Sequence, residues 1–212
     1  MNRRALTAGF TLIEVLVALT IMAVMAMMAW QGVDGIVRAR DSGAARLERT
    51  LRLNTVVAQW EQDLASIQDS ATVPALVCDG ATVRLTRRAE DGLQVVAWAL
   101  RPDGSNFTWW RWASPAVTTV TELQDYWLRT QQFQGGEPGQ LRTLAGLAGW
   151  QVYFFQGNAW SNCQSTGNLA APTPGASAPL RQALPSGVRV VLSFVEGSGE
   201  NGSIVRDSLL GP

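Results

Sequence analysis

Apolar side chains dominate residues 10–30, and Glu14 is the single charged residue among them. The length of this run is close to the roughly 20 residues that a helix needs to cross the hydrocarbon core of a bilayer. Arg3 and Arg4 precede it. By the positive-inside rule they hold the start of the chain in the cytoplasm and send the later residues outward. The pattern therefore predicts one membrane-spanning helix over residues 10–30.

Beyond Trp30 the pattern becomes amphipathic, because charged residues enter while apolar residues continue at roughly helical spacing. No proline occurs before Pro74. We therefore expect one continuous helix from Phe10 to about Asp69, which would be roughly 90 Å long at 1.5 Å per residue. Residues 31–70 of this helix are predicted to form an amphipathic stem. Its apolar positions include Leu47, Leu51, Val56, Val57 and Trp60.

Three glycines, Gly32, Gly35 and Gly43, fall where this helix would leave the bilayer. Each weakens a helix by about 1 kcal/mol relative to alanine. Three interpretations stay open: the glycines allow the helix to bend, they allow close packing against another helix, or they are simply tolerated.

Residues 71–212 are predicted to form a β-rich head. Two Asp-Gly turns separate short runs rich in valine, leucine and tryptophan, which predicts antiparallel strands near 82–88, 93–100 and 106–112. A long helix packed on such a sheet is an α+β fold.

The rest of the head is less regular. Residues 150–155 have the aromatic content of another strand, and residues 187–210 are typical of a final hairpin with a glycine-rich loop. Residues 121–133 are expected to form a short helix or an irregular connection. The proline, alanine, glycine and serine content of residues 165–185 predicts an exposed, mobile loop.

Composition excludes several chemistries. The 17 basic residues are all arginine, they balance 17 acidic residues, and the chain has neither lysine nor histidine. This removes Schiff-base lysines, imidazole bases and histidine metal ligands, so we predict no catalytic site, no cofactor and no metal. A neutral chain without a clustered basic face also argues against a nucleic-acid partner.

The two cysteines, Cys78 and Cys163, lie too far apart in the sequence for a Cys-x-x-Cys motif. If the head is exported, they form one structural disulfide; the alternative is two buried thiols.

Four tryptophans, Trp98, Trp109, Trp110 and Trp112, could form a platform for a glycan or peptide. However, strand alternation turns Trp109 away from Trp110 and Trp112. At least one side should therefore be core, and we favour packing over ligand binding.

The segment Gly-Phe-Thr-Leu-Ile-Glu at residues 9–14 resembles the type IV prepilin-like signal. The resemblance implies that a prepilin peptidase removes the leader, residues 1–9, by cutting after Gly9 on the cytoplasmic side and N-methylates Phe10, with the whole helix left attached. The alternative is an ordinary secretory signal peptide. The apolar run exceeds the usual 7 to 15 residues of such peptides, and its far end offers only imperfect cleavage sites.

For Glu14 the resemblance implies a role in assembly: its carboxylate neutralises the terminal amine of a neighbouring subunit. An ion buried without a counter-charge is costly, so the pair would select the register of assembly. The alternative is a tolerated carboxylate that reaches the membrane interface.

The chain also resembles the J-type minor pseudopilins of type II secretion systems. The resemblance rests on Gly-Val-Asp at residues 32–34, Trp-Glu-Gln-Asp-Leu at 60–64, Val-Arg-Leu-Thr-Arg-Arg at 83–88 and the segment at 184–194. It implies a pilin-like fold and a non-enzymatic subunit of the bacterial inner membrane, with the head in the periplasm. The implied partners are the I-type and K-type minor pseudopilins, the H-type and major pseudopilins, and the inner-membrane assembly platform. The five apolar stem residues from Leu47 to Trp60 would be divided between the sheet of their own head and neighbouring stems.

Three other hypotheses stay open: a minor pilin of a type IV pilus, a signal-anchored periplasmic glycan-binding module, and an anchored enzyme that uses paired carboxylates.

Overall fold

The computed structural model describes residues 10–133, 136–165 and 184–210. The leader with Gly9 and most of the loop expected at 165–185 lie outside these residues. The chain divides into two compact units, Met1–Thr50 and Leu51–Pro212, which are described in turn.

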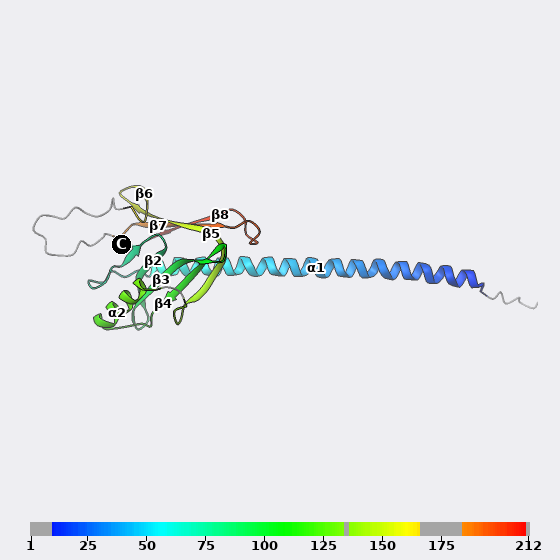
Figure 1. Cartoon of the computed structure of the whole chain (residues 1–212), viewed down its shortest axis with the longest axis horizontal. Coiled ribbons are helices and arrows are strands. Elements are labelled where there is room, and N and C mark those ends of the chain that lie inside the picture. The colour runs from blue at the N-terminus through cyan, green and yellow to red at the C-terminus, as the bar shows by residue number, and fades with distance from the viewer. Residues whose placement is uncertain (1–9, 134–135, 166–183, 211–212) are drawn as a thin grey trace, which may run out of the picture. The chain divides into compact units, whose positions relative to one another are not determined.

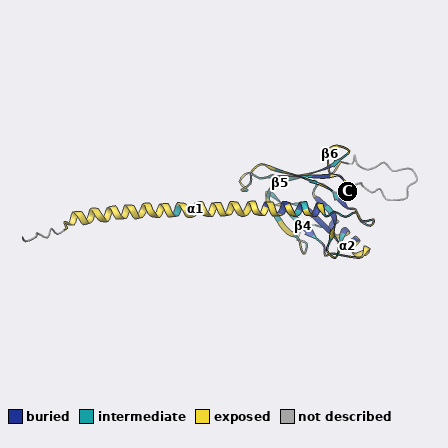
Figure 2. Ribbon diagram, turned by 180° about the vertical axis from the view of Figure 1, so that it is seen from behind, coloured by how far each residue is buried: buried dark blue, intermediate teal, exposed yellow. Residues whose placement is uncertain are grey.

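The first unit consists of the amino-terminal part of helix α1, which runs from Leu12 to Ala65. The expected continuous helix is confirmed, with its ends a few residues inside the expected ones. Side chains of the unit are exposed throughout, with Asp34 alone half-buried among its described residues (Figure 2). This helix is therefore not stabilised by packing within its own unit.

The second unit contains the last turns of α1, the helix α2 and a sheet in which all strand pairs are antiparallel. Its strand order is β1-β2-β3-β4-β5-β7-β8, and β6 pairs with β5. The elements of the head are β1 Leu76–Cys78, β2 Thr82–Ala89, β3 Gly92–Asp103, β4 Asn106–Ala113, α2 Val120–Gln131, β5 Leu141–Gln156, β6 Ala159–Asn162, β7 Gly187–Phe194 and β8 Ser203–Leu209. The α+β pilin-like architecture, a long apolar helix followed by an antiparallel sheet, is confirmed.

Strand β5 connects the two halves of the sheet. Its first part, up to Leu147, pairs with β4, and its second part pairs with β7 and β6. Gly146, with φ of +74°, and a register shift between Leu147 and Gly149 mark the change of partner. As a result the last turns of α1 lie between β2–β4 on one side and β5, β7 and β8 on the other (Figure 1).

The main hydrophobic core of the head lies around these last turns of α1. Leu53, Trp60 and Leu64 pack there against residues from both halves of the sheet, such as Trp98 of β3 and Val190 of β7. A helix with one apolar face gains most of its stability from such burial. The core therefore joins the end of α1 to both halves of the sheet.

A second, smaller core lies where α2 packs against the sheet. Leu123 and Trp127 of α2 contact a cluster that includes Val95 and Trp112. Thr119 caps α2 by accepting a hydrogen bond from the backbone N–H of Glu122. The sheet is thus covered by α1 on one face and by α2 on the other.

The hairpin between β2 and β3 requires glycine at one position. Gly92 has φ of +148°, and a Cβ at this residue would lie 2.3 Å from the carbonyl oxygen of Val117. The same carbonyl accepts a hydrogen bond from the N–H of Leu93 at 2.9 Å. A side chain at Gly92 would therefore displace the loop that leads into α2.

The strands expected at 82–88, 93–100 and 106–112 and the hairpin at 187–210 are confirmed. The irregular connection left open at 121–133 is a helix. The strand expected at 150–155 already begins at Leu141, and the short strands β1 and β6 were not predicted.

Candidate functional site

The amino-terminal end of α1 is closed by a reciprocal pair of hydrogen bonds. The backbone N–H of Thr11 donates to Oε2 of Glu14 at 2.9 Å, and the N–H of Glu14 donates to the Thr11 hydroxyl at 3.3 Å. The Thr11 hydroxyl also donates to the same carboxylate oxygen at 2.9 Å. This is a capping box, in which a threonine and a glutamate three residues later satisfy amides that the helix leaves unpaired.

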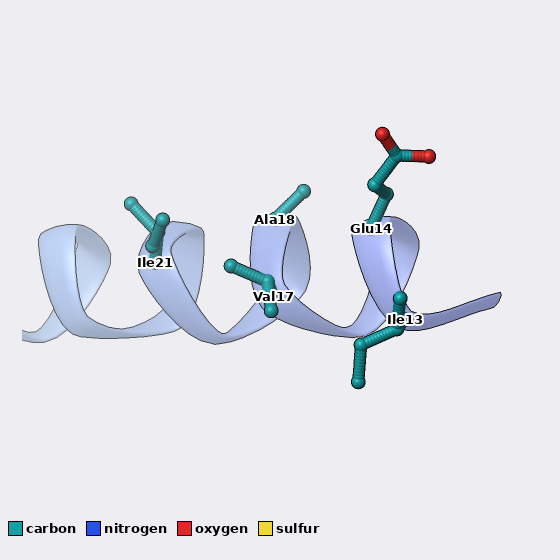
Figure 3. A pocket seen from close by; sticks show the side chains of 5 residues that line it. All are labelled: Ile13, Glu14, Val17, Ala18 and Ile21. Atoms are coloured by element: carbon teal, nitrogen blue, oxygen red, sulfur yellow. The ribbon is translucent and has the colours of Figure 1, made fainter. Parts of the chain in front are cut away.

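The capping box uses only one of the two oxygens of Glu14. Among the described residues, nothing donates a hydrogen bond to Oε1. Figure 3 shows the carboxylate pointing away from the helix on the same side as Ala18. A shallow depression is lined by Ile13, Glu14, Val17, Ala18 and Ile21. The carboxylate is thus the one charged group of an exposed apolar surface, and it can accept a further donor from another molecule.

Phe10, the residue expected to become the new terminus, is described and almost fully exposed. Gly9, the residue expected to precede the cut, lies outside the described residues. The processing site therefore stays a prediction as far as its geometry is concerned.

The structure divides the five stem residues that were expected to bind partners. Leu47 and Leu51 are exposed to 60% and 56%. Val56, Val57 and Trp60 belong instead to the core of the head, where Trp60 is fully buried. Partner binding is corrected for these three, because their own sheet already covers their side chains.

A buried carboxylate fixes the end of α1 on the sheet. Asp63 is fully buried, and its Oδ1 accepts hydrogen bonds from Arg87 at 2.7 Å, Arg111 at 2.9 Å and Gln59 at 3.0 Å. Its Oδ2 accepts from Arg111 and from the indole N–H of Trp98, both at 2.8 Å. Burial of a carboxylate is tolerated when it is paired and hydrogen-bonded, as here. Strands β2, β3 and β4 thus hold the helix through one side chain.

Four tryptophans pack together beside this carboxylate. The ring centroids of Trp98 and Trp109 are 4.4 Å apart, and Trp60 lies 5.6 Å from Trp98 and 5.4 Å from Trp109. Trp150 contacts Trp60 and Trp109 and donates its N–H to the carbonyl of Gly80 at 2.8 Å. Edge-to-face and tilted contacts of this kind stabilise a core beyond the area that they bury.

The proposed tryptophan platform is not present on the surface. Trp98 and Trp109 are fully buried in the main core, and Trp112 is buried in the second core. Trp110 is half-buried. Packing, the interpretation favoured from the sequence, accounts for three of these four side chains.

Cys78 and Cys163 are joined by a disulfide with a Cα–Cα distance of 5.7 Å. Cys78 ends β1, beside β2, and Cys163 follows β6, beside β5. The bond therefore connects the two halves of the sheet. Among the described residues, no group of three or more histidine, cysteine, aspartate or glutamate side chains is placed to hold a metal ion.

The outer strand pair of the head carries an exposed ion pair. Arg189 of β7 donates to both carboxylate oxygens of Asp207 of β8, at 2.7 and 2.6 Å, and its guanidinium lies over the Trp160 ring. The hydrogen bonds from Arg189 lower the pKa of Asp207, and the carboxylate raises the pKa of Arg189.

Comparison with known families supports the prepilin-like interpretation of the amino-terminal segment. Residues 4–30 match the prokaryotic N-terminal methylation motif. A search of curated proteins returned no match to this chain. The match covers the capping box and the apolar run but none of the head.

Among the described residues, α1 is the one helix long and apolar enough to cross a membrane. The motif and this helix together indicate a type IV pilin-like protein that is anchored in a membrane by a single span. Such a protein is consistent with either a pilin or a pseudopilin.

Proposed function

We propose that this chain is a J-type minor pseudopilin of a type II secretion system. In this role it would join the I-type and K-type minor pseudopilins, with the H-type subunit nearby, at the tip of a pseudopilus. The tip complex would prime assembly of the major pseudopilin by the inner-membrane platform. Folded proteins would then be exported across the outer membrane.

The observation that carries the proposal is a methylation motif whose glutamate stands alone on an exposed apolar helix. A carboxylate in hydrocarbon is stable only with a partner. Because one oxygen of Glu14 already serves the capping box and the other is open, we propose that the terminal amine of a neighbouring processed subunit supplies that partner.

The stem supports the J-type assignment in one respect. The Trp-Glu-Gln-Asp-Leu segment at 60–64, on which the resemblance rests, supplies the three buried residues Trp60, Asp63 and Leu64 that dock α1 on the sheet. The segment that carries the resemblance therefore contains the residues that attach the head to its stem.

The proposal implies an order of segments in the membrane. Residues 1–9 are a cytoplasmic leader that the prepilin peptidase removes, and residues 10–30 cross the bacterial inner membrane. Residues 31–70 form the stem, and residues 71–212 form a periplasmic head. The subunit has no catalytic role in this account.

The test is a deletion strain complemented with variants of the chain. Wild type should restore export of folded proteins, and Glu14→Gln should not, although it is cleaved and inserted, because a neutral amide cannot neutralise the amine. Glu48→Gln, a change at another exposed glutamate of α1, is the matched control and should restore export.

Normal export together with loss of surface pili would identify a minor pilin of a type IV pilus instead. Full activity of Glu14→Gln in either process would contradict the assembly role of Glu14.

A further inference from the structure

The sheet of the head ends at β8, and no described strand covers the outer edge of this strand. β8 pairs with β7 from Ser203 to Leu209 without a register shift, and it contains neither proline nor lysine. The opposite end of the sheet, β1, has three residues and carries Cys78 of the disulfide. Proteins commonly keep an edge from pairing with other chains by short edge strands, bulges, lysine or proline. The β8 edge, as we call it, has none of these.

The hydrogen bonds at both ends of the β7–β8 pair show which backbone groups of β8 point outward. The N–H of Leu210 donates to the carbonyl of Ser186 at 3.0 Å, and the N–H of Phe194 donates to that of Gly202 at 2.9 Å. In an antiparallel pair, residues that bond to the neighbouring strand alternate with residues that do not. The even-numbered residues of β8 therefore bond to β7. The N–H and C=O groups of the odd-numbered residues face away from it: Ser203, Val205, Asp207 and Leu209.

The side chains of these odd-numbered residues lie on the face of the sheet opposite the core. All of them are exposed, whereas Ile204 on the other face packs against the core. Asp207 is already paired with Arg189. Val205 and Leu209 are exposed to 47% and 86%. Among the described residues, nothing bonds to the outward backbone groups. The β8 edge thus combines open backbone groups with two exposed apolar side chains.

The outward groups define what can cover them. Donors and acceptors that lie in the plane of a sheet, at every second residue, match the backbone of another extended segment. A helix does not match, because its backbone groups already bond to each other. A second copy is disfavoured as well. The fullest antiparallel pairing of two β8 strands is centred on Arg206 and places its guanidinium opposite that of the other copy, and like charges directly opposite are destabilising.

We propose that an extended segment of a different protein chain adds to the β8 edge as a further strand. Backbone hydrogen bonds to the odd-numbered residues hold this segment. On the outer face its side chains continue two rows of the sheet, Val191–Val205 and Gly187–Leu209. We expect β-branched or aromatic residues opposite Val205 and Leu209, because such side chains pack best as cross-strand neighbours. The inference goes beyond the proposed function, since it concerns the head and applies to a secretion subunit and a pilus subunit alike.

The experiment uses the full-length chain in membranes of its native host, with a photo-crosslinking amino acid at Ser203, Val205 or Leu209. A probe at Leu128, an exposed residue of α2, is the control. Adducts are identified by mass spectrometry of the crosslinked peptides. We expect the β8 probes to crosslink one segment of one other chain. Moving the probe by two residues should move the crosslinked residue by about two, which is the step of a paired strand.

Proline at position 205 tests the backbone hydrogen bonds, in the Leu209 probe background. Val205→Pro removes an outward N–H and leaves every N–H that bonds to β7. It should reduce the adduct roughly tenfold or more, whereas Val205→Thr, which keeps the N–H and the β-branch, should retain it. Ile204→Pro removes an N–H that bonds to β7 and should instead lower the stability of the head.

A second variant tests the same edge without changing its backbone. Val205→Lys places a charge on the edge strand, which hinders the addition of a further strand, and it should also reduce the adduct. Chemical denaturation in detergent compares the variants, and both changes at Val205 should keep the midpoint of the wild type. Where Val205→Pro lowers the midpoint, the result for Val205→Lys decides.

The inference is overturned by adducts within one chain or between two copies only, by equal adducts from the Leu128 probe, or by the absence of adducts. It is also overturned if the crosslinked residues do not follow the step of two, or if the adduct survives the deciding change at Val205. The outcome is separable from that of the proposed function. A strand-like adduct with a pilus subunit, in cells with normal export, would uphold the β8 edge and reject the secretion role. Export that depends on the chain, without such an adduct, would do the reverse.

Discussion

Two acidic residues of the same helix, Glu14 and Asp63, have opposite surroundings. Asp63 is fully buried and accepts five hydrogen bonds from four side chains of its own chain. Glu14 is exposed, and the capping box with Thr11 supplies its only described partner. The head thus satisfies the buried carboxylate of Asp63 internally, whereas Glu14 in the first unit keeps one carboxylate oxygen open.

The difference divides one helix into two environments. The last turns of α1 are constrained by the fold of the head, because their apolar side chains pack in its main core. The earlier turns, which include Glu14, are exposed and pack against no other described part of their unit. Changes in the head should therefore alter stability, and changes in the first unit should alter assembly.

The largest effect is expected for Asp63→Asn. It leaves Arg87 and Arg111 without their counter-charge and should lower the free energy of unfolding of the head by about 3 kcal/mol or more. Chemical denaturation of the chain in detergent, followed by tryptophan fluorescence, measures this change. Glu61→Gln on the same turn is the control, and Glu14→Gln should leave the transition of the head unchanged. Equal stability of Asp63→Asn and wild type would show that the buried pairs do not hold the helix.

Removal of the disulfide should have an effect of comparable size. The bond closes a loop with a sequence separation of 85, for which the chain-entropy model gives about 4.6 kcal/mol. The Cys78→Ser, Cys163→Ser double variant should unfold at correspondingly lower denaturant concentration. A reducing agent should lower the stability of the wild type but not that of the variant. An unchanged denaturation midpoint in the double variant would show that the disulfide between the two halves of the sheet does not stabilise the head.

Two fully buried tryptophans provide a matched pair. The indole N–H of Trp98 donates to Asp63, whereas that of Trp60 has no acceptor among the described residues. Both phenylalanine variants lose packing, but Trp98→Phe also removes one donor from a buried carboxylate and should cost about 1–3 kcal/mol more. The comparison uses the same denaturation assay. Equal losses would mean that the hydrogen bond contributes nothing.

The smallest effect concerns the exposed pair of Arg189 and Asp207. Because Arg189 lowers the pKa of Asp207 below its ordinary value of 3.8, the pair stabilises the head fully above that value. The contribution is lost as the pH falls through the lowered pKa. Asp207→Asn should therefore be slightly less stable than wild type at neutral pH, and the two should converge in acid. A stability difference that persists at the lowest pH would show that it does not come from the charge of Asp207.

The sequence predicts those parts of the head whose signals are local. Asp-Gly turns and β-branched residues mark β2, β3 and β4, and the absence of proline marks α1. The first part of β5, Leu141–Gly149, carries leucine, alanine and glycine instead of strand-forming residues, and β4 supplies its pairing. Such a strand is specified by its neighbours and not by its own propensity.

The candidate sites show the same limit. The motif at residues 9–14 identifies Glu14 without any structure, since its residues are consecutive. Three of the side chains that donate to Asp63 lie on three different strands. A motif of consecutive residues could therefore not identify this buried site. One signal was available: Arg87 continues the alternation of the buried residues Val83 and Leu85, which places an arginine on a core face and requires a buried acid.

We infer that the chain is processed and assembled through its amino-terminal segment. The most direct test isolates the full-length protein from membranes of its native host and determines its terminal residue and mass, in cells with and without the prepilin peptidase. We expect an N-methylated Phe10 that appears only with the peptidase. An intact Met1 in both strains, or a terminus beyond residue 24, would contradict it.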